Sequence, residues 1–179
     1  GGLIVLKGDI TTAGLTANGT NNVGDVDFDG DVKIDGAVTI TTDTANSTVN
    51  DGKIDFGANA IDALTTGGSS ATDTLTLVSG SGAITTGNIG VTTPLNELLI
   101  NSSGGASAIT IKRIGTFGGA AGVTGTTTIG NAATATLTLD NGVANTASGF
   151  NFGGTTILKA AGDIVTDKDI NIETDEDLT

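Results

Sequence analysis

The stretch DVDFDGDVKIDGAVTI, residues 25–40, alternates apolar and polar side chains over most of its length. Its apolar positions are Val26, Phe28, Val32, Ile34, Val38 and Ile40. Because successive residues of a β-strand point to opposite faces, this alternation predicts strands with one buried side and one solvated side. Glycines at positions 30 and 36 predict very short strands joined by tight corners.

The same alternating pattern recurs along the chain. It is found at residues 53–56, 74–77, 97–100, 109–111, 136–139 and 169–172. Asn-Gly and Asp-Gly pairs, which tolerate the positive φ of tight turns, lie at 18–19, 29–30, 35–36, 51–52 and 141–142. No window has the 3.6-residue period of an amphipathic helix. We therefore expect an all-β protein with almost no helix.

The spacing of the strands predicts their arrangement. The apolar positions Ile34, Phe56, Leu77 and Ile100 are 22, 21 and 23 residues apart, and a fixed period in this range is typical of solenoids. We expect a single parallel β-helix (β-solenoid) over residues 1–179, with about eight coils of roughly 21 residues and three short strands a coil. An antiparallel sandwich would leave the period unexplained, and its core usually needs larger side chains than five Phe without Trp or Tyr.

Composition argues against many functions. The chain has no His and no Cys, so it has no imidazole base, no thiol nucleophile and no thiolate zinc site. Its net charge of -13 argues against binding nucleic acid or an anionic membrane. No segment reaches the roughly 20 apolar residues of a membrane span, so we expect no membrane insertion. We expect a protein that is not an enzyme and has no cofactor.

The most site-like feature is the run of acids Asp25, Asp27, Asp29 and Asp31. DVDFDG matches the first half of an EF-hand calcium loop, but the twelfth loop position, where a bidentate acid belongs, is Gly36. If the run is one extended strand, its carboxylates share an outer face and repel one another, which Ca²⁺ or Lys33 would relieve. Two readings follow: a structural Ca²⁺ site, or a solvated acidic edge that keeps the rod soluble and discourages sideways pairing.

Three segments resemble the degenerate repeats of filamentous-haemagglutinin-type bacterial surface proteins. They are TTPLNELLIN at 92–101, GAVTI at 36–40 and DTLTLVSGSGAITTGNIG at 73–90, and the resemblance extends over residues 25–179. It implies a right-handed parallel β-helix, secretion, and a place in an adhesin or fibre at the cell surface. It supplies no catalytic motif and no particular receptor.

The resulting expectation is a building block of an extracellular fibre, sheath or adhesin, cut from a longer protein. Its partners would be further coils of the same polypeptide or a second subunit, joined end to end through exposed strand edges. The alternative is an adhesin stalk that binds a cell-surface glycan, with a loop at 115–125 as a candidate contact. Less favoured are an ice-binding solenoid, because Asp27, Asp55 and Glu97 would interrupt its Thr-x-Thr strings, and a polysaccharide-degrading β-helix enzyme, which usually needs aromatic platforms.

Overall fold

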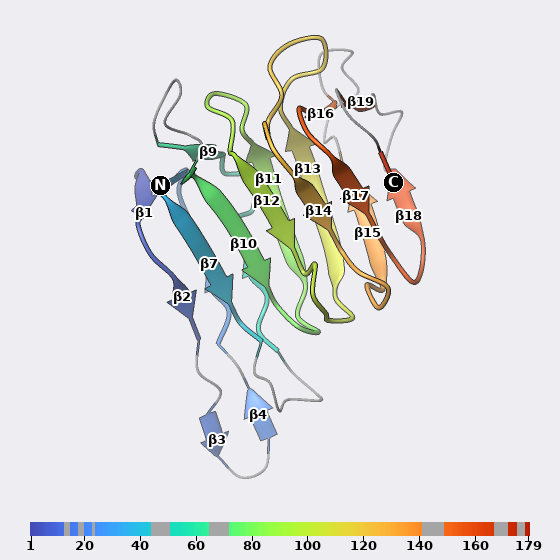
Figure 1. Cartoon of the computed structure of the whole chain (residues 1–179). Coiled ribbons are helices and arrows are strands. Elements are labelled where there is room, and N and C mark those ends of the chain that lie inside the picture. The colour runs from blue at the N-terminus through green and yellow to red at the C-terminus, as the bar shows by residue number, and fades with distance from the viewer. Residues whose placement is uncertain are drawn as a thin grey trace.

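The chain folds into a stack of parallel β-strands. The computed structural model describes residues 1–12, 15–17, 20–22, 24–43, 51–64, 72–140, 149–166, 172–174 and 178–179. Within these ranges the chain forms nineteen β-strands and no α-helix. One hairpin, made of β3 (Leu15–Ala17) and β4 (Thr20–Asn22), is antiparallel and lies apart from the stack (Figure 1). The other strand pairs in the described ranges are parallel, so the expected β-solenoid is confirmed.

The strands are arranged on three faces, each defined by its pairing. The first face holds β5 (Val26–Asp27), β8 (Ile54–Asp55), the first halves of β11 (Ile84–Ile89) and β13 (Ala108–Ile114), β15 (Thr136–Leu139) and β18 (Ile164–Thr166). The second face holds β1 (Ile4–Leu6), β6 (Val32–Ile34), β9 (Ile61–Ala63), the ends of β11 and β13, β16 (Phe150–Phe152) and β19 (Ile172–Thr174). The two faces belong to one sheet because β11 and β13 run through both.

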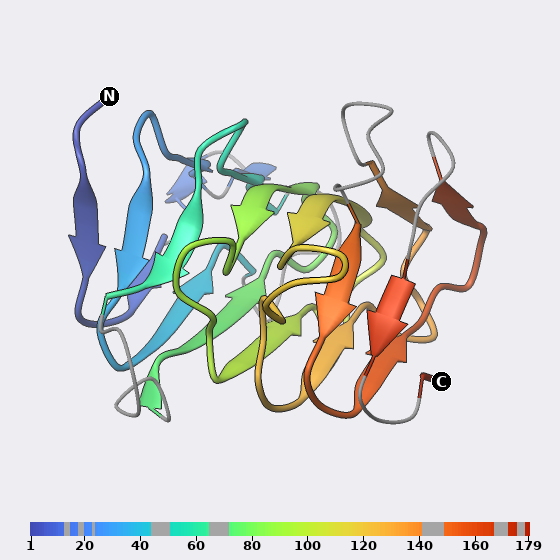
Figure 2. The ribbon, with the colours of Figure 1, turned by 90° about the horizontal axis from the view of Figure 1, so that it is seen from above.

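The third face is a separate six-stranded sheet, the front layer of Figure 1. It holds β2 (Ile10–Thr11), β7 (Ala37–Thr41), β10 (Thr74–Val78), β12 (Glu97–Ile100), β14 (Thr127–Ile129) and β17 (Thr156–Leu158). Each coil passes from the first face to the second and then to the third. The amino and carboxyl ends of the chain consequently lie at opposite ends of the stack (Figure 2).

The solenoid has about five turns rather than the eight expected from the sequence. Residues stacked in adjacent coils are usually about 28 to 30 positions apart: the Lys53 amide bonds Asp25, 28 positions earlier, and the Ala60 amide bonds Asp31, 29 positions earlier. The expected 21-residue period was wrong because it joined positions on different faces. Ile34 stacks on the second face with Ala63, whereas Leu77 stacks on the third with Ile100.

The core is a column of aliphatic and aromatic side chains enclosed by the three faces. Five of the six apolar positions in residues 25–40 are buried, and Val26 packs against the core from the edge. Phe28 and Phe56 stack in adjacent coils with ring centroids 4.4 Å apart and planes 12° apart. Stacking apolar side chains from successive coils removes apolar surface from water, at roughly 25 cal/mol per Å².

Buried amide side chains hold the corner that follows the third face. Asn101 has a φ of +43° and is almost completely buried, and its Oδ1 accepts the Ser79 N–H at 2.8 Å. Its Nδ2 donates to the Ser79 Oγ at 3.1 Å and to the Ser107 hydroxyl. One coil later, the Asn131 Nδ2 donates to the Asn101 carbonyl at 2.6 Å. These bonds satisfy polar groups of the turning backbone that the strand ladders leave unpaired.

Candidate functional site

The acidic run 25–31 does not form one strand. Only Val26–Asp27 is paired as β5, and the next strand begins at Val32, so the run is divided by a corner. The Asp25 Oδ1 accepts the Lys53 backbone N–H at 2.9 Å, and the Asp27 carboxylate pairs with the Lys53 Nζ at 2.8 Å. The assumption that four carboxylates share one face is therefore wrong.

The other two members of the run differ in their surroundings. The Asp31 Oδ1 accepts the Ala60 N–H at 2.8 Å, whereas Asp29 is solvent-exposed and lines the same cavity as Asp27. In the described part of the chain, no group of three or more acidic side chains is placed to hold a metal ion. A calcium site at Asp25, Asp27, Asp29 and Asp31 stays a prediction, because Ca²⁺ takes six to eight oxygen ligands and can draw flexible carboxylates together.

The aspartates have a shared role that sequence reasoning missed. Five aspartates in the described ranges accept a backbone N–H from the adjacent coil, about 30 positions along the chain. The pairs are Asp9 with Thr39, Asp25 with Lys53, Asp31 with Ala60, Asp51 with Ser81, and Asp62 with Thr92 and Thr93. A carboxylate is a strong acceptor for the N–H groups that corners leave unpaired. An Asp near a predicted corner can be recognised in the sequence, but the N–H group that it accepts depends on the length of the coil.

Asp62 is the most buried of these acids, at 3% exposed. Its Oδ1 accepts the N–H groups of Thr92 and Thr93 at 3.0 and 3.2 Å. Its Oδ2 lies 3.1 Å from the Lys33 Nζ, which comes from the coil before. The charge is thus fully paired in an apolar setting, as a buried ion must be if it is not to destabilise the fold.

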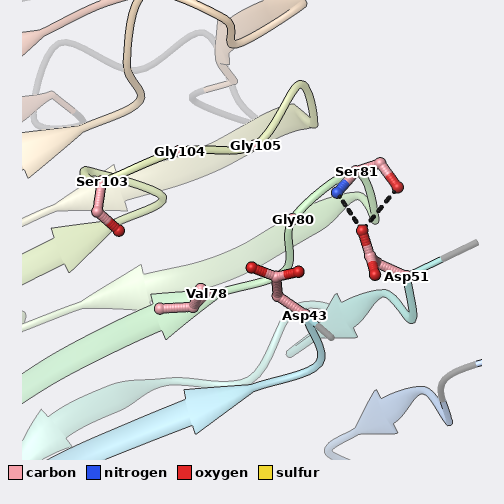
Figure 3. A pocket seen from close by; sticks show the side chains of 8 residues that line it. All are labelled: Asp43, Asp51, Val78, Gly80, Ser81, Ser103, Gly104 and Gly105. Atoms are coloured by element: carbon pink, nitrogen blue, oxygen red, sulfur yellow. Dashed lines mark hydrogen bonds between the residues drawn. The ribbon is translucent and has the colours of Figure 1, made fainter. Parts of the chain in front are cut away.

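A first cavity, of about 290 Å³, lies where the third face turns toward the first (Figure 3). Two carboxylates line it, Asp43 and Asp51. The Asp51 Oδ2 accepts the backbone N–H of Ser81 at 2.8 Å and its hydroxyl at 2.9 Å. Burial, together with the neighbouring Asp51 charge, raises the pKa of Asp43 above its usual value. Both carboxylates lie against Gly80, whose φ of +57° and lack of a side chain make room for them.

A second cavity, of about 320 Å³, lies beside β5 and β8 on the outside of the first face. The Lys53 ammonium lies there between two carboxylates, 2.8 Å from Asp27 and 3.4 Å from Asp55. The hydrogen bond to Asp27 raises the pKa of Lys53. Asn59 also lines this cavity, and its Nδ2 donates to the Phe28 carbonyl at 2.7 Å. Asp27 and Asp55 are stacked in adjacent coils, and one cation, Lys53, pairs with both of them.

The expected loop at 115–125 exists and is held by side-chain bonds. The Arg113 Nε donates to the Gly115 carbonyl at 2.9 Å and its guanidinium also bonds the Thr116 hydroxyl at 3.1 Å. From the next coil, the Asn151 Nδ2 donates to the Thr116 carbonyl at 3.0 Å. Phe117, near the tip, is 38% exposed. The loop therefore presents one aromatic ring on a fixed backbone.

The Thr-x-Thr strings at 39–41 and 74–76 lie on neighbouring strands of the third face but are offset by two residues, so that Thr76 pairs with Thr39 whereas Thr74 pairs with Ala37. Of the three acids expected to interrupt them, only Glu97 lies on that face. Asp27 and Asp55 lie on the first face. On the next strand, β12, Leu99 stacks on Thr76 and interrupts the threonine pattern.

Comparison of the chain with protein-family models, with curated proteins and with solved structures gives no match. No helix in the described ranges is long and apolar enough to cross a membrane.

Proposed function

We propose that the chain is a non-enzymatic structural segment of the cell exterior, a β-solenoid building block of a fibre, sheath or surface adhesin. The observation that supports this function is the use of the polar side chains. The carboxylates of Asp25, Asp31 and Asp62 and the amides of Asn101 and Asn131 bond the backbone of adjacent coils. These carboxylate and amide side chains therefore serve to fix one coil to the next.

The mechanism is mechanical. Backbone hydrogen bonds run along the stacking direction, so a pull between the ends is shared by three ladders of parallel strands. Fixed corners keep those ladders in register. The extracellular setting rests on the resemblance of residues 25–179 to surface-fibre repeats, together with an acidic exterior that keeps a long rod soluble.

The alternative function is an adhesin stalk that binds a glycan on another cell. One observation favours it: the loop at 115–125 is fixed by Arg113 and Asn151 and holds Phe117 partly exposed. An aromatic ring on a rigid loop is a usual element of a contact surface. Substituting Phe117 by Ala, with Thr128→Ala on the third face as the control, would reduce glycan or cell binding only if this alternative holds.

Two measurements test the proposed function: the location of the protein on the producing cell, and the shape of the purified chain. Antibodies against the folded chain should label intact producing cells, and electron microscopy of the purified chain should show rods, single or joined. Labelling only after the cells are permeabilised would overturn the extracellular role. The microscopy is done with calcium and with a chelator, and a requirement for calcium would support the predicted site at Asp25–Asp31, whereas identical particles in both would contradict it.

A further inference from the structure

The third face carries almost no charge on its outer side. Glu97 is the only charged residue in the six strands of this sheet. The first face, by contrast, carries Asp27 and Asp55 in its strands, and the second face carries Lys33 and Arg113. In a chain with a net charge of -13, one side of the stack is therefore nearly neutral.

The neutral side presents an ordered row of side chains, which we call the outer row. Thr39, Thr76 and Leu99 stack on one another in successive strands, and the row continues on β14 and ends at Ile157. The first three are partly buried, whereas their neighbours along each strand lie in the core. Figure 1 shows this sheet as the front layer of the stack. The outer row therefore runs down the middle of the face, parallel to the stacking direction.

We propose that the third face is a lateral docking surface for a second copy of the chain, packed face to face with the two stacking directions parallel. The charge distribution selects this occupant. Two copies that carry -13 each repel one another wherever their acids meet. The third face lets them approach without burying the carboxylates of the first face, such as Asp27 and Asp55. The proposal goes beyond the structural role above, because it concerns the side of the rod and not its place on the cell.

The one charge on the face selects the orientation of the pair. A two-fold axis along the outer row sets each member of the row against the same residue of the other copy, and it places Glu97 opposite the corner at 101–103. The reversed order that overlaps strands β7 to β17 is centred on β12, so it sets Glu97 against Glu97. Like charges that face each other across the roughly 10 Å between packed sheets repel, and the parallel order is therefore favoured.

The size of the face predicts a weak association. Five strands of three to five residues, about 4.8 Å apart, give a footprint of roughly 300–400 Å² per copy. A specific interface usually buries about 1,200–2,000 Å² over both partners. We therefore expect a dimer with a dissociation constant of about 0.1 mM.

Chemical cross-linking tests the orientation. The chain has no Cys, so a single substitution gives one thiol per copy. In the parallel order, Thr39→Cys and Leu99→Cys should each form a covalent dimer with a short bis-maleimide, because each member of the outer row faces its own counterpart. Packed sheets are about 10 Å apart, which is too far for a direct disulfide. The control is Thr138→Cys, at an outward position of the first face.

Both possible failures of the cross-linking are informative. Dimer yields for Thr39→Cys and Leu99→Cys no higher than for Thr138→Cys would overturn docking through this face. A dimer from only one of the two variants would overturn the parallel order, since the reversed order brings at most one position of the row opposite itself.

Sedimentation equilibrium tests the strength of the contact. The unmodified chain should dimerise as its concentration rises, and more strongly at high salt, which screens the repulsion between the acids. Thr76→Lys should weaken the association by about tenfold or more, because it buries an unpaired ammonium in the middle of the face. Thr138→Lys adds the same charge to the first face and should leave the association unchanged. Circular dichroism checks that both variants fold.

Equal losses in Thr76→Lys and Thr138→Lys, or weaker association at high salt, would overturn a neutral contact between copies. A chain that sediments as a monomer at every concentration would overturn the second copy as the occupant. If that monomer then co-sedimented with an insoluble uncharged polysaccharide, and Thr76→Lys abolished the binding, the face would be a polysaccharide-binding surface instead. Labelling of intact cells, which tests the structural role, is independent of all these results.

Discussion

Asp62→Ala should destabilise the solenoid strongly. The side chain accepts two backbone N–H groups from one coil and pairs with the Lys33 ammonium from another. Removing it leaves two donors and one partly buried charge without partners. Breaking a buried ion pair costs about 3–5 kcal/mol, and we expect a loss in that range.

Two further variants separate the contributions. Asp62→Asn can keep its Oδ1 on the amides of Thr92 and Thr93 while losing the ion pair, so it should cost about 1–2 kcal/mol. Lys33→Met removes the cation and keeps both amide bonds. A double-mutant cycle of these two substitutions isolates the energy of the pair. The surface pair of Lys7 and Asp35, 2.8 Å apart and solvent-exposed, provides the control.

The assay is equilibrium unfolding in urea, followed by circular dichroism. Asp35→Ala should lower the free energy of unfolding by less than about 1 kcal/mol, as exposed ion pairs do. If Asp62→Ala proved no more harmful than Asp35→Ala, the reasoning that buried carboxylates fix one coil to the next would be refuted. Should Asp62→Ala fail to fold, Asp62→Asn and Lys33→Met still give the interaction energy of the Asp62–Lys33 pair.

Three other substitutions test separate parts of the structure. Phe56→Ala empties a fully buried site and should cost about 3–5 kcal/mol in the same assay, whereas a loss below 1 kcal/mol would mean that the stacked rings add little. Asn101→Ala should destabilise by about 2–4 kcal/mol, because it removes several hydrogen bonds at a positive φ, and Asn101→Gly should cost less because glycine tolerates that φ. Asp43→Asn should raise the melting temperature slightly at pH 7. Burial and the Asp51 charge raise the folded-state pKa of Asp43, so the folded chain is more stable with this group protonated and loses stability as the pH rises from its ordinary value through the raised pKa. Since Asp43 is only partly buried, the gain is about 0.5 kcal/mol, and it should vanish below pH 3.8, where the carboxyl is neutral in both states. A gain that persisted at pH 3 would contradict this cause.

The sequence by itself determined the class of fold and the identity of the core. The alternation at 25–40 predicts which side chains are buried, and the structure buries Val32, Ile34, Val38 and Ile40 almost completely. Strands at 97–100 and 136–139 have the expected bounds. These features are local, because a period of two and a turn residue act within a few positions of the chain.

Only the tertiary structure decided the coil length and the partners of the acids. A strand of two to seven residues has the same pattern on any of the three faces, so the sequence does not reveal which strands stack. On the third face, successive partners are 37 positions apart from Val38 to Leu75 but 23 from Leu75 to Leu98. Corners of unequal length set these distances. The register they produce brings aspartates such as Asp31 and Asp62 to an N–H about 30 positions away, and that juxtaposition exists only once the coils are stacked.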